Sequence, residues 1–146
     1  MRKLFYAIGA AICLATSNVA SAACAHQNVY NSGMNVPLGG SAIVYAPINT
    51  SCTYGVMTFK FEDLSGNYPT NTIRHFIERS ERSYTGAYYW KTVYQKTTYS
   101  VRDVTIMYPV SIPGSYRYRV ENIGNSVIRN WYMEGKVPLF NIPSYY

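Results

Sequence analysis

Apolar and polar residues alternate along most of this chain, in short segments separated by turn residues. Met57, Phe59 and Phe61 occupy every second position, and Thr58 and Lys60 lie between them. This period of two is typical of a strand with one buried and one wet face. Tyr, Val, Ile and Thr, which suit a pleated surface, are frequent, and no segment keeps a helical period. The expected strands are residues 41–46, 54–61, 72–79, 87–96, 99–107, 115–122 and 127–134.

Seven short strands at this spacing predict an antiparallel β-sandwich. The alternation is clearest at 115–122, where Tyr116, Tyr118 and Val120 are expected to face the core and charged residues separate them. The C-terminal stretch 137–146 is apolar but contains two prolines, which cannot donate to a sheet ladder. We therefore expect this stretch to be an extended tail that lies on the domain.

Residues 112–122, with the sequence IPGSYRYRVEN, resemble a late strand of immunoglobulin-like and fibronectin-type-III-like domains. In those domains a Pro/Gly turn leads into a Gly-x-Tyr-x-Tyr-x-Val run, and a final strand follows. The resemblance implies an immunoglobulin-like β-sandwich of about seven strands. The inter-sheet cysteine pair of antibody domains is absent, because Cys24 and Cys52 both lie early in the chain. Since such sandwiches have many functions, the resemblance implies only an architecture.

Residues 1–22 have the layout of a secretory signal peptide. Arg2 and Lys3 precede an uncharged apolar run over 4–15, and small residues occupy 20–22, where a signal peptidase would cleave. The apolar run is short for a permanent membrane span, and no second run of spanning length follows. We therefore predict one domain over residues 23–146, without an integral membrane segment, in an extracellular or periplasmic location.

Two cysteines remain after the leader is removed, Cys24 and Cys52, which are 28 residues apart. In an oxidising compartment two thiols of a small domain usually pair, so we expect a structural disulfide. An alternative is lipidation, because Cys24 follows Ser21-Ala22-Ala23, which looks like a bacterial lipoprotein box. That box prefers a larger aliphatic residue where Ser21 stands, and lipidation would leave Cys52 unpaired.

Candidate catalytic groups are few. The predicted mature chain has two histidines, His26 and His75, and it has no Gly-x-Ser-x-Gly motif. No closely spaced metal ligands and no glycine-rich phosphate loop occur. The sequence therefore predicts no enzymatic activity, no catalytic residue, no metal and no cofactor. The formal charge of +6, which includes Arg2 and Lys3, favours acidic surfaces in general, and nucleic acid is not an expected partner.

Aromatic residues give the strongest indication of function. The chain has 16 tyrosines, and a domain of this size cannot easily bury so many hydroxyl groups with partners. The densest cluster is Tyr88, Tyr89, Trp90 and Tyr94, in which Tyr88, Trp90, Thr92 and Tyr94 are expected to share one strand face. Either this cluster is a binding site for a protein or carbohydrate surface, or Tyr88 and Trp90 fill the core.

These observations predict a secreted, non-catalytic recognition domain that binds a protein or glycan surface through exposed aromatic residues. One alternative is a fimbrial subunit that assembles by strand donation, as the early cysteine pair and Tyr145 suggest. Against it, residues 25–34 lack the alternating apolar pattern of a donor strand. A second alternative is a secreted membrane-active factor, although the chain has no strongly basic amphipathic helix.

Overall fold

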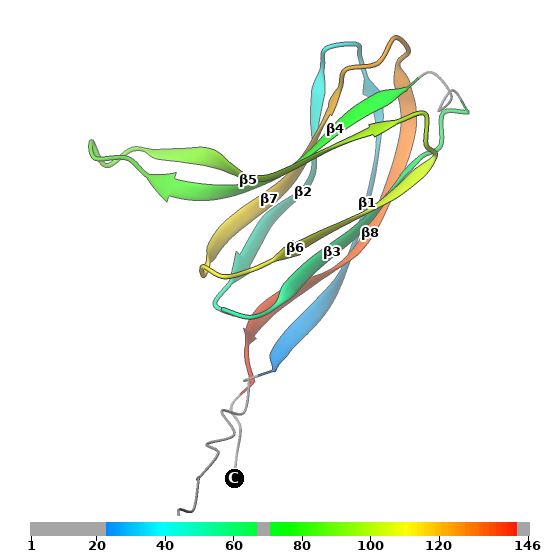
Figure 1. The fold of residues 1–146 in the computed structure, drawn as a ribbon. Coiled ribbons are helices and arrows are strands. Elements are labelled where there is room, and N and C mark those ends of the chain that lie inside the picture. The colour runs from blue at the N-terminus through cyan, green and yellow to red at the C-terminus, as the bar shows by residue number, and fades with distance from the viewer. Residues whose placement is uncertain (1–22, 67–70, 143–146) are drawn as a thin grey trace, which may run out of the picture.

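The computed structural model describes residues 23–66 and 71–142, and these form antiparallel β-strands with short connections (Figure 1). Eight strands make up two four-stranded sheets. The strands are β1 (Cys24–Val36), β2 (Ser41–Thr50), β3 (Val56–Asp63), β4 (Thr72–Arg82), β5 (Tyr88–Tyr99), β6 (Asp103–Pro109), β7 (Gly114–Asn122) and β8 (Ile128–Asn141).

The strand order shows how the chain is wrapped. One sheet has the order β1-β8-β3-β6, and the other has the order β2-β7-β4-β5. The first strand pairs with the last, the second with the seventh, the third with the sixth and the fourth with the fifth, always antiparallel. A long antiparallel ribbon rolled into two sheets in this way has the topology of a jelly roll.

The predicted β-sandwich is therefore confirmed, but the immunoglobulin-like strand order is not. In an immunoglobulin domain the sheets hold strands ABED and CFG, so the first strand lies beside the second, whereas here the first strand lies beside the eighth and the second beside the seventh. The strand motif at 112–122 reports an alternation of buried and exposed positions, and every two-sheet antiparallel fold needs that alternation. It contains no information on which strand lies beside which.

β1 was not expected, and its sequence explains why. Only Val29 and Val36 of this edge strand are buried. The strand is instead held by its backbone ladder with β8, which runs from Cys24 opposite Asn141 to Val36 opposite Ile128. Residues 25–34 are thus paired within their own sheet, which argues against their use as a donor strand for another subunit.

The C-terminal tail was also predicted incorrectly as far as residue 141. β8 continues through Pro138 to Asn141, and Val137 is buried. The proline is tolerated because it lies opposite His26, next to a shift in the β1–β8 register, and because β3 pairs with β8 only up to Lys136. Residues 143–146 lie outside the described part of the chain.

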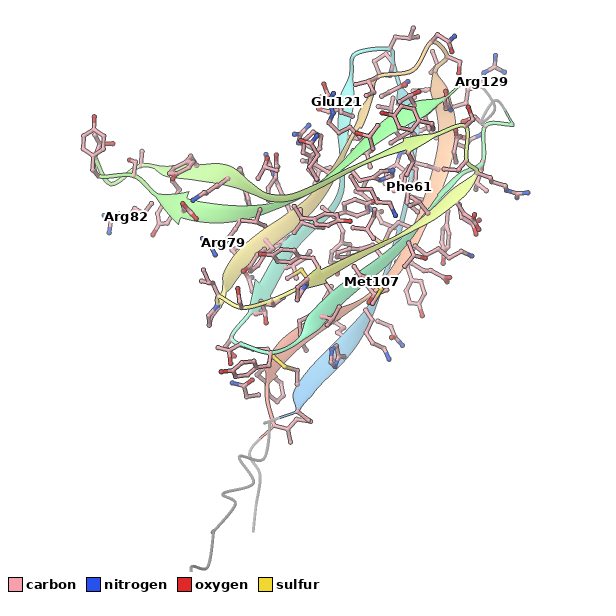
Figure 2. The ribbon with its side chains drawn as sticks, viewed as in Figure 1. Phe61, Arg79, Arg82, Met107, Glu121 and Arg129 are labelled. Carbon is pink, nitrogen blue, oxygen red and sulfur yellow. A yellow bond between two sulfur atoms is a disulfide. The ribbon has the colours of Figure 1, made fainter. Side chains whose placement is uncertain are left out.

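The core lies between the sheets and has the side chains that the alternation predicted. Phe59 and Phe61 of β3 and Tyr116 and Tyr118 of β7 are almost completely buried. The rings of Phe59 and Tyr118 stack with their centroids 4.9 Å apart. Figure 2 shows Phe61 between the two sheets.

The side chain of His75 is polar and fully buried in this core. Its Nδ1 lies 2.8 Å from the Tyr118 hydroxyl, and its Nε2 lies 3.0 Å from Thr98 Oγ1. Thr98 donates its own proton to the Ile73 carbonyl at 3.3 Å, so it accepts from Nε2–H, and Tyr118 donates to Nδ1. Burial lowers the pKa of His75 to about 3, so this histidine is neutral at physiological pH.

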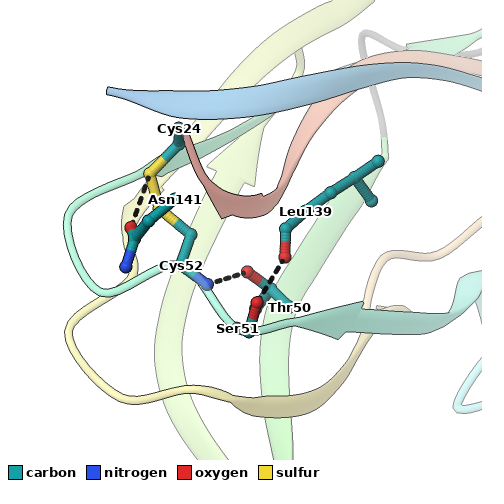
Figure 3. The surroundings of a disulfide bond; sticks show 6 residues. All are labelled: Cys24, Thr50, Ser51, Cys52, Leu139 and Asn141. Atoms are coloured by element: carbon teal, nitrogen blue, oxygen red, sulfur yellow. Dashed lines mark hydrogen bonds between the residues drawn. A yellow bond between two sulfur atoms is a disulfide. The ribbon is translucent and has the colours of Figure 1, made fainter. Parts of the chain in front are cut away.

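The predicted disulfide between Cys24 and Cys52 is present, with 6.0 Å between the Cα atoms (Figure 3). It joins the start of β1 to the segment after β2, so it links the two sheets. Nearby, Ser51 N–H donates to the Leu139 carbonyl at 2.8 Å, and Cys52 N–H donates to Thr50 Oγ1 at 3.1 Å. The end of the sandwich at which β1 begins and β8 ends is thus held by a covalent bond and by hydrogen bonds.

The predicted signal peptide, residues 1–22, lies outside the described residues. Across 23–66 and 71–142, no helix is long and apolar enough to cross a membrane.

Candidate functional site

A two-stranded arm projects from the sandwich. β4 pairs with β7 only from Ile73 to Arg79, but its pairing with β5 continues to Arg82 opposite Tyr88. Residues 80–90, here called the β4–β5 arm, therefore extend beyond the third strand of their sheet. Figure 1 shows this hairpin reaching away from both sheets, and Figure 2 shows Arg82 on it.

The tip of the arm is a well-defined turn. Ser83 N–H donates to the Ala87 carbonyl at 2.7 Å, and Gly86 N–H donates to the Ser83 carbonyl at 2.9 Å. Gly86 has a φ of +90°, which glycine adopts without a steric penalty, as expected for a three-residue hairpin loop. Arg82 Nε also donates to the Gly86 carbonyl, at 3.1 Å. This turn places Tyr84 at the tip, fully exposed.

Three of the four predicted binding residues lie on the arm and are exposed. Tyr88 is 75% exposed, Tyr89 46% and Trp90 37%, so Tyr88 and Trp90 do not fill the core. Tyr88 lies opposite Arg82 in the register, and Trp90 lies opposite Ser80, so these side chains share the outer face of the sheet. Tyr89 points to the opposite face of the arm.

The fourth predicted residue, Tyr94, is not part of this surface. A β-bulge shifts the register so that Ile77 lies opposite Tyr94 and Glu78 opposite Thr92, with Val93 as the extra residue. Tyr94 therefore turns inward and packs against Tyr108, with 6.3 Å between the ring centroids. The expectation that Tyr88, Trp90, Thr92 and Tyr94 share one face is wrong for Tyr94.

Charged and aromatic side chains lie together on the outer face of the sheet, next to the arm. We call Phe76, Glu78, Trp90, Arg117 and Arg119 the Glu78 cluster. The carboxylate of Glu78, 6% exposed, accepts from Arg117 Nε at 2.6 Å and from Arg119 Nε at 3.0 Å. The Arg117 guanidinium lies over the Trp90 ring, 4.5 Å from its centroid. The Arg119 guanidinium lies 4.0 Å from the centroid of the Phe76 ring. One carboxylate thus fixes two guanidinium groups, each against an aromatic ring.

A second cluster stiffens the opposite face of the arm. Glu81 pairs with Arg79, accepts from the Tyr89 hydroxyl at 3.0 Å and lies 3.5 Å from Lys91 Nζ. The hydrogen bond from Arg79 and then that from Tyr89 lower the pKa of Glu81, so its carboxylate is ionised at neutral pH. The same carboxylate raises the pKa of Tyr89. Tyr89 therefore keeps its proton at neutral pH, and its hydrogen bond to Glu81 fixes the orientation of its ring.

The histidine in the core is not available to a substrate. His75 is buried, neutral and hydrogen-bonded at both ring nitrogens, so it has no free site for a substrate proton. Within 23–66 and 71–142, no three His, Cys, Asp or Glu side chains gather in a group that could hold a metal ion.

Sequence reasoning missed Tyr84 and the Glu78 cluster. The turn signal for Tyr84 was available, since Gly86 follows it closely between two polar strands. The alternating charges of 115–122 showed that Arg117 and Arg119 share a face. Their partner Glu78 could not be found, because it comes from another strand and the strand order was unknown.

The sequence matches no protein-family model, and a search of curated proteins finds no relative. Among solved structures, the chain is similar to the Yersinia pseudotuberculosis-derived mitogen, with 11% sequence identity and a TM-score of 0.45. The match covers 79% of this chain and 87% of that chain. A likeness of this degree says nothing about what this chain binds.

Proposed function

We propose that this protein is a secreted, non-catalytic recognition domain that binds a protein or carbohydrate surface with its β4–β5 arm. The observation that supports this proposal is the exposure of Tyr84, Tyr88, Tyr89 and Trp90 on a ribbon outside the sandwich. Tyrosine and tryptophan offer large, stiff contact areas with a polar edge, and they are enriched where proteins bind partners.

The arm has no evident role in holding the fold together. Its residues extend past Arg79, where the pairing of β4 with β7 ends. Tyr84, Tyr88 and Tyr89 are not part of the hydrophobic core. Clustered exposed aromatic residues usually mark an interaction site in a soluble domain. The bonds made by Glu81 and Arg82 hold the arm in shape, which lowers the entropy that binding would otherwise lose.

The secreted and non-catalytic parts of the proposal have separate support. The Cys24–Cys52 disulfide fits an oxidising compartment, as the predicted leader also indicates. The absence of a catalytic motif in the sequence and the sequestered His75 favour binding over catalysis.

The test is a binding screen with purified protein on an array of neutral and acidic glycans and on immobilised extracellular-matrix proteins. A double variant, Tyr84→Ala with Tyr88→Ala, should lose at least tenfold in affinity for whatever the wild-type protein binds, since hot-spot aromatics each contribute about 2 kcal/mol. Its melting temperature should stay within a few degrees of wild type, because neither ring is buried.

The matched control is Tyr54→Ala with Tyr99→Ala, which removes two exposed tyrosines that lie off the arm. Binding of this control should equal that of wild type. Equal losses in both double variants, or wild-type binding that survives the arm substitutions, would contradict the proposal. A wild-type protein that binds nothing on either panel would also count against it.

A further inference from the structure

The outer face of the β2-β7-β4-β5 sheet has an excess of cations beside the arm. Cross-strand pairing places Arg74, Arg82, Arg117 and Arg119 on this face, with Glu78 and Glu121 as its carboxylates. Glu121 lies 3.4 Å from Arg74, and Glu78 is shared by the other two central arginines. This side of the sheet therefore has four guanidinium groups and two carboxylates, and its formal charge is positive.

The two central guanidinium groups are set up to bind an anion. Glu78 and the rings of Trp90 and Phe76 already fix Arg117 and Arg119, so the entropy of ordering these long side chains is lost before any ligand arrives. Arg117 uses only its Nε toward Glu78, and within the described residues its terminal nitrogens have no acceptor. A free guanidinium edge can donate two parallel hydrogen bonds to a sulfate or carboxylate group.

The surroundings favour a sugar polymer. Trp90 and Tyr88 offer partly exposed rings on which the C–H face of a sugar can stack, while Ser80, Thr92 and Gln95 supply hydroxyl and amide groups on the same face. This is an open sheet surface; a hollow such as the one over Tyr30, Lys60 and Lys136 lies on the opposite sheet. An extended chain can make many shallow contacts along such a surface, whereas a small ligand would not be enclosed.

An acidic protein fits this surface less well. Protein interfaces depend on apolar anchors that become fully buried. Tyr88 and Trp90 at the margin of this face are exposed, but the Phe76 ring among the arginines is 6% exposed and covered by Arg119, so it is not available as such an anchor. We propose that the Glu78 cluster binds a sulfated or carboxylated polysaccharide, with Arg117 holding its anionic groups and Trp90 and Tyr88 stacking on its sugar rings. This inference rests on the proposed function and names the partner class of the same arm.

The test uses heparin as the probe, immobilised on a sensor surface at physiological salt, with uncharged dextran as the neutral control. Wild type should bind heparin and not dextran, and binding should weaken as salt rises. Arg117→Gln and Trp90→Ala should each weaken heparin binding at least fivefold. Circular dichroism checks folding, and if Arg117→Gln fails to fold, Arg117→Lys replaces it, since lysine keeps the positive charge beside Glu78 but lacks the forked donor edge.

The matched control is Lys136→Gln, which removes one exposed cation from the outer face of the other sheet. Its affinity for heparin should stay within twofold of wild type. Equal losses in Lys136→Gln and Arg117→Gln would overturn the inference, because binding would then depend on net charge alone. No wild-type binding to heparin would also overturn it.

Two further probes separate other kinds of partner. Poly-glutamate and vesicles with an anionic lipid should bind more weakly than heparin, and Trp90→Ala should not change that residual binding. Stronger binding to either probe than to heparin would reject the polysaccharide. If heparin binding is absent but the Tyr84→Ala, Tyr88→Ala variant still loses another target, this inference fails and the proposed function stands.

Discussion

At the scale of single residues, the most informative group is a buried polar side chain, His75. Unpaired buried polar groups are costly, and here each ring nitrogen has one partner, so the histidine is tolerated in an otherwise apolar core. In the sequence, His75 shares the alternation of Ile73 and Ile77, which leaves open whether it is packed or on the surface. The sequence could not show Tyr118 and Thr98 as partners, because they come from two other strands.

This histidine should make stability depend on pH. Its pKa is about 3 in the folded protein against 6.5 for an ordinary histidine, so below pH 6.5 the unfolded chain binds a proton that the folded chain does not. Stability should therefore fall as pH drops, by up to about 1.4 kcal/mol per unit. Urea unfolding at pH 6.5 and 5.0 should show a loss of about 2 kcal/mol in wild type. His75→Gln should show a smaller loss; the same loss in both proteins would contradict this account.

At the scale of elements, strands with an alternating apolar pattern were predictable and the others were not. β3 and β7 follow from the positions of Phe59 and Tyr118, which share one face with their apolar neighbours. β1 is held by its backbone and by the fit of Gly33 against the Trp131 ring, so composition did not reveal it. The bulge in β5 was equally hidden, since the extra residue, Val93, is an ordinary strand former.

The close approach of Gly33 to Trp131 predicts a strong effect of a small substitution. A Cβ at Gly33 would lie 2.3 Å from Trp131 Cζ2, so the ring or the strand would have to move. Gly33→Ala should lower the free energy of unfolding by about 1–3 kcal/mol, as expected for overpacking. Urea denaturation checks this, with Ser32→Ala at the exposed neighbouring position as the control. A Gly33→Ala protein as stable as wild type would show that β1 does not dock as described.

At the scale of the whole molecule, the sequence predicted a two-sheet sandwich and its disulfide, but it did not predict the jelly-roll order. Alternation reports which side of a strand is buried, whereas the order of strands depends on contacts between distant segments. The Glu78 cluster depends on that order, because it joins β4, β5 and β7. The arm was in part predictable, since Tyr88, Tyr89 and Trp90 stood out by composition and only Tyr94 was misplaced.

The central claim is that the β4–β5 arm and the sheet face beside it form the binding surface. The most direct measurement is a ¹⁵N–¹H NMR titration of the purified protein with a heparin oligosaccharide. The account predicts shifts of the Trp90 indole N–H and of backbone amides over residues 80–92 and 117–119, with no shift around Lys136. Shifts centred on Lys60 and Lys136, or spread evenly over all exposed lysines and arginines, would contradict it.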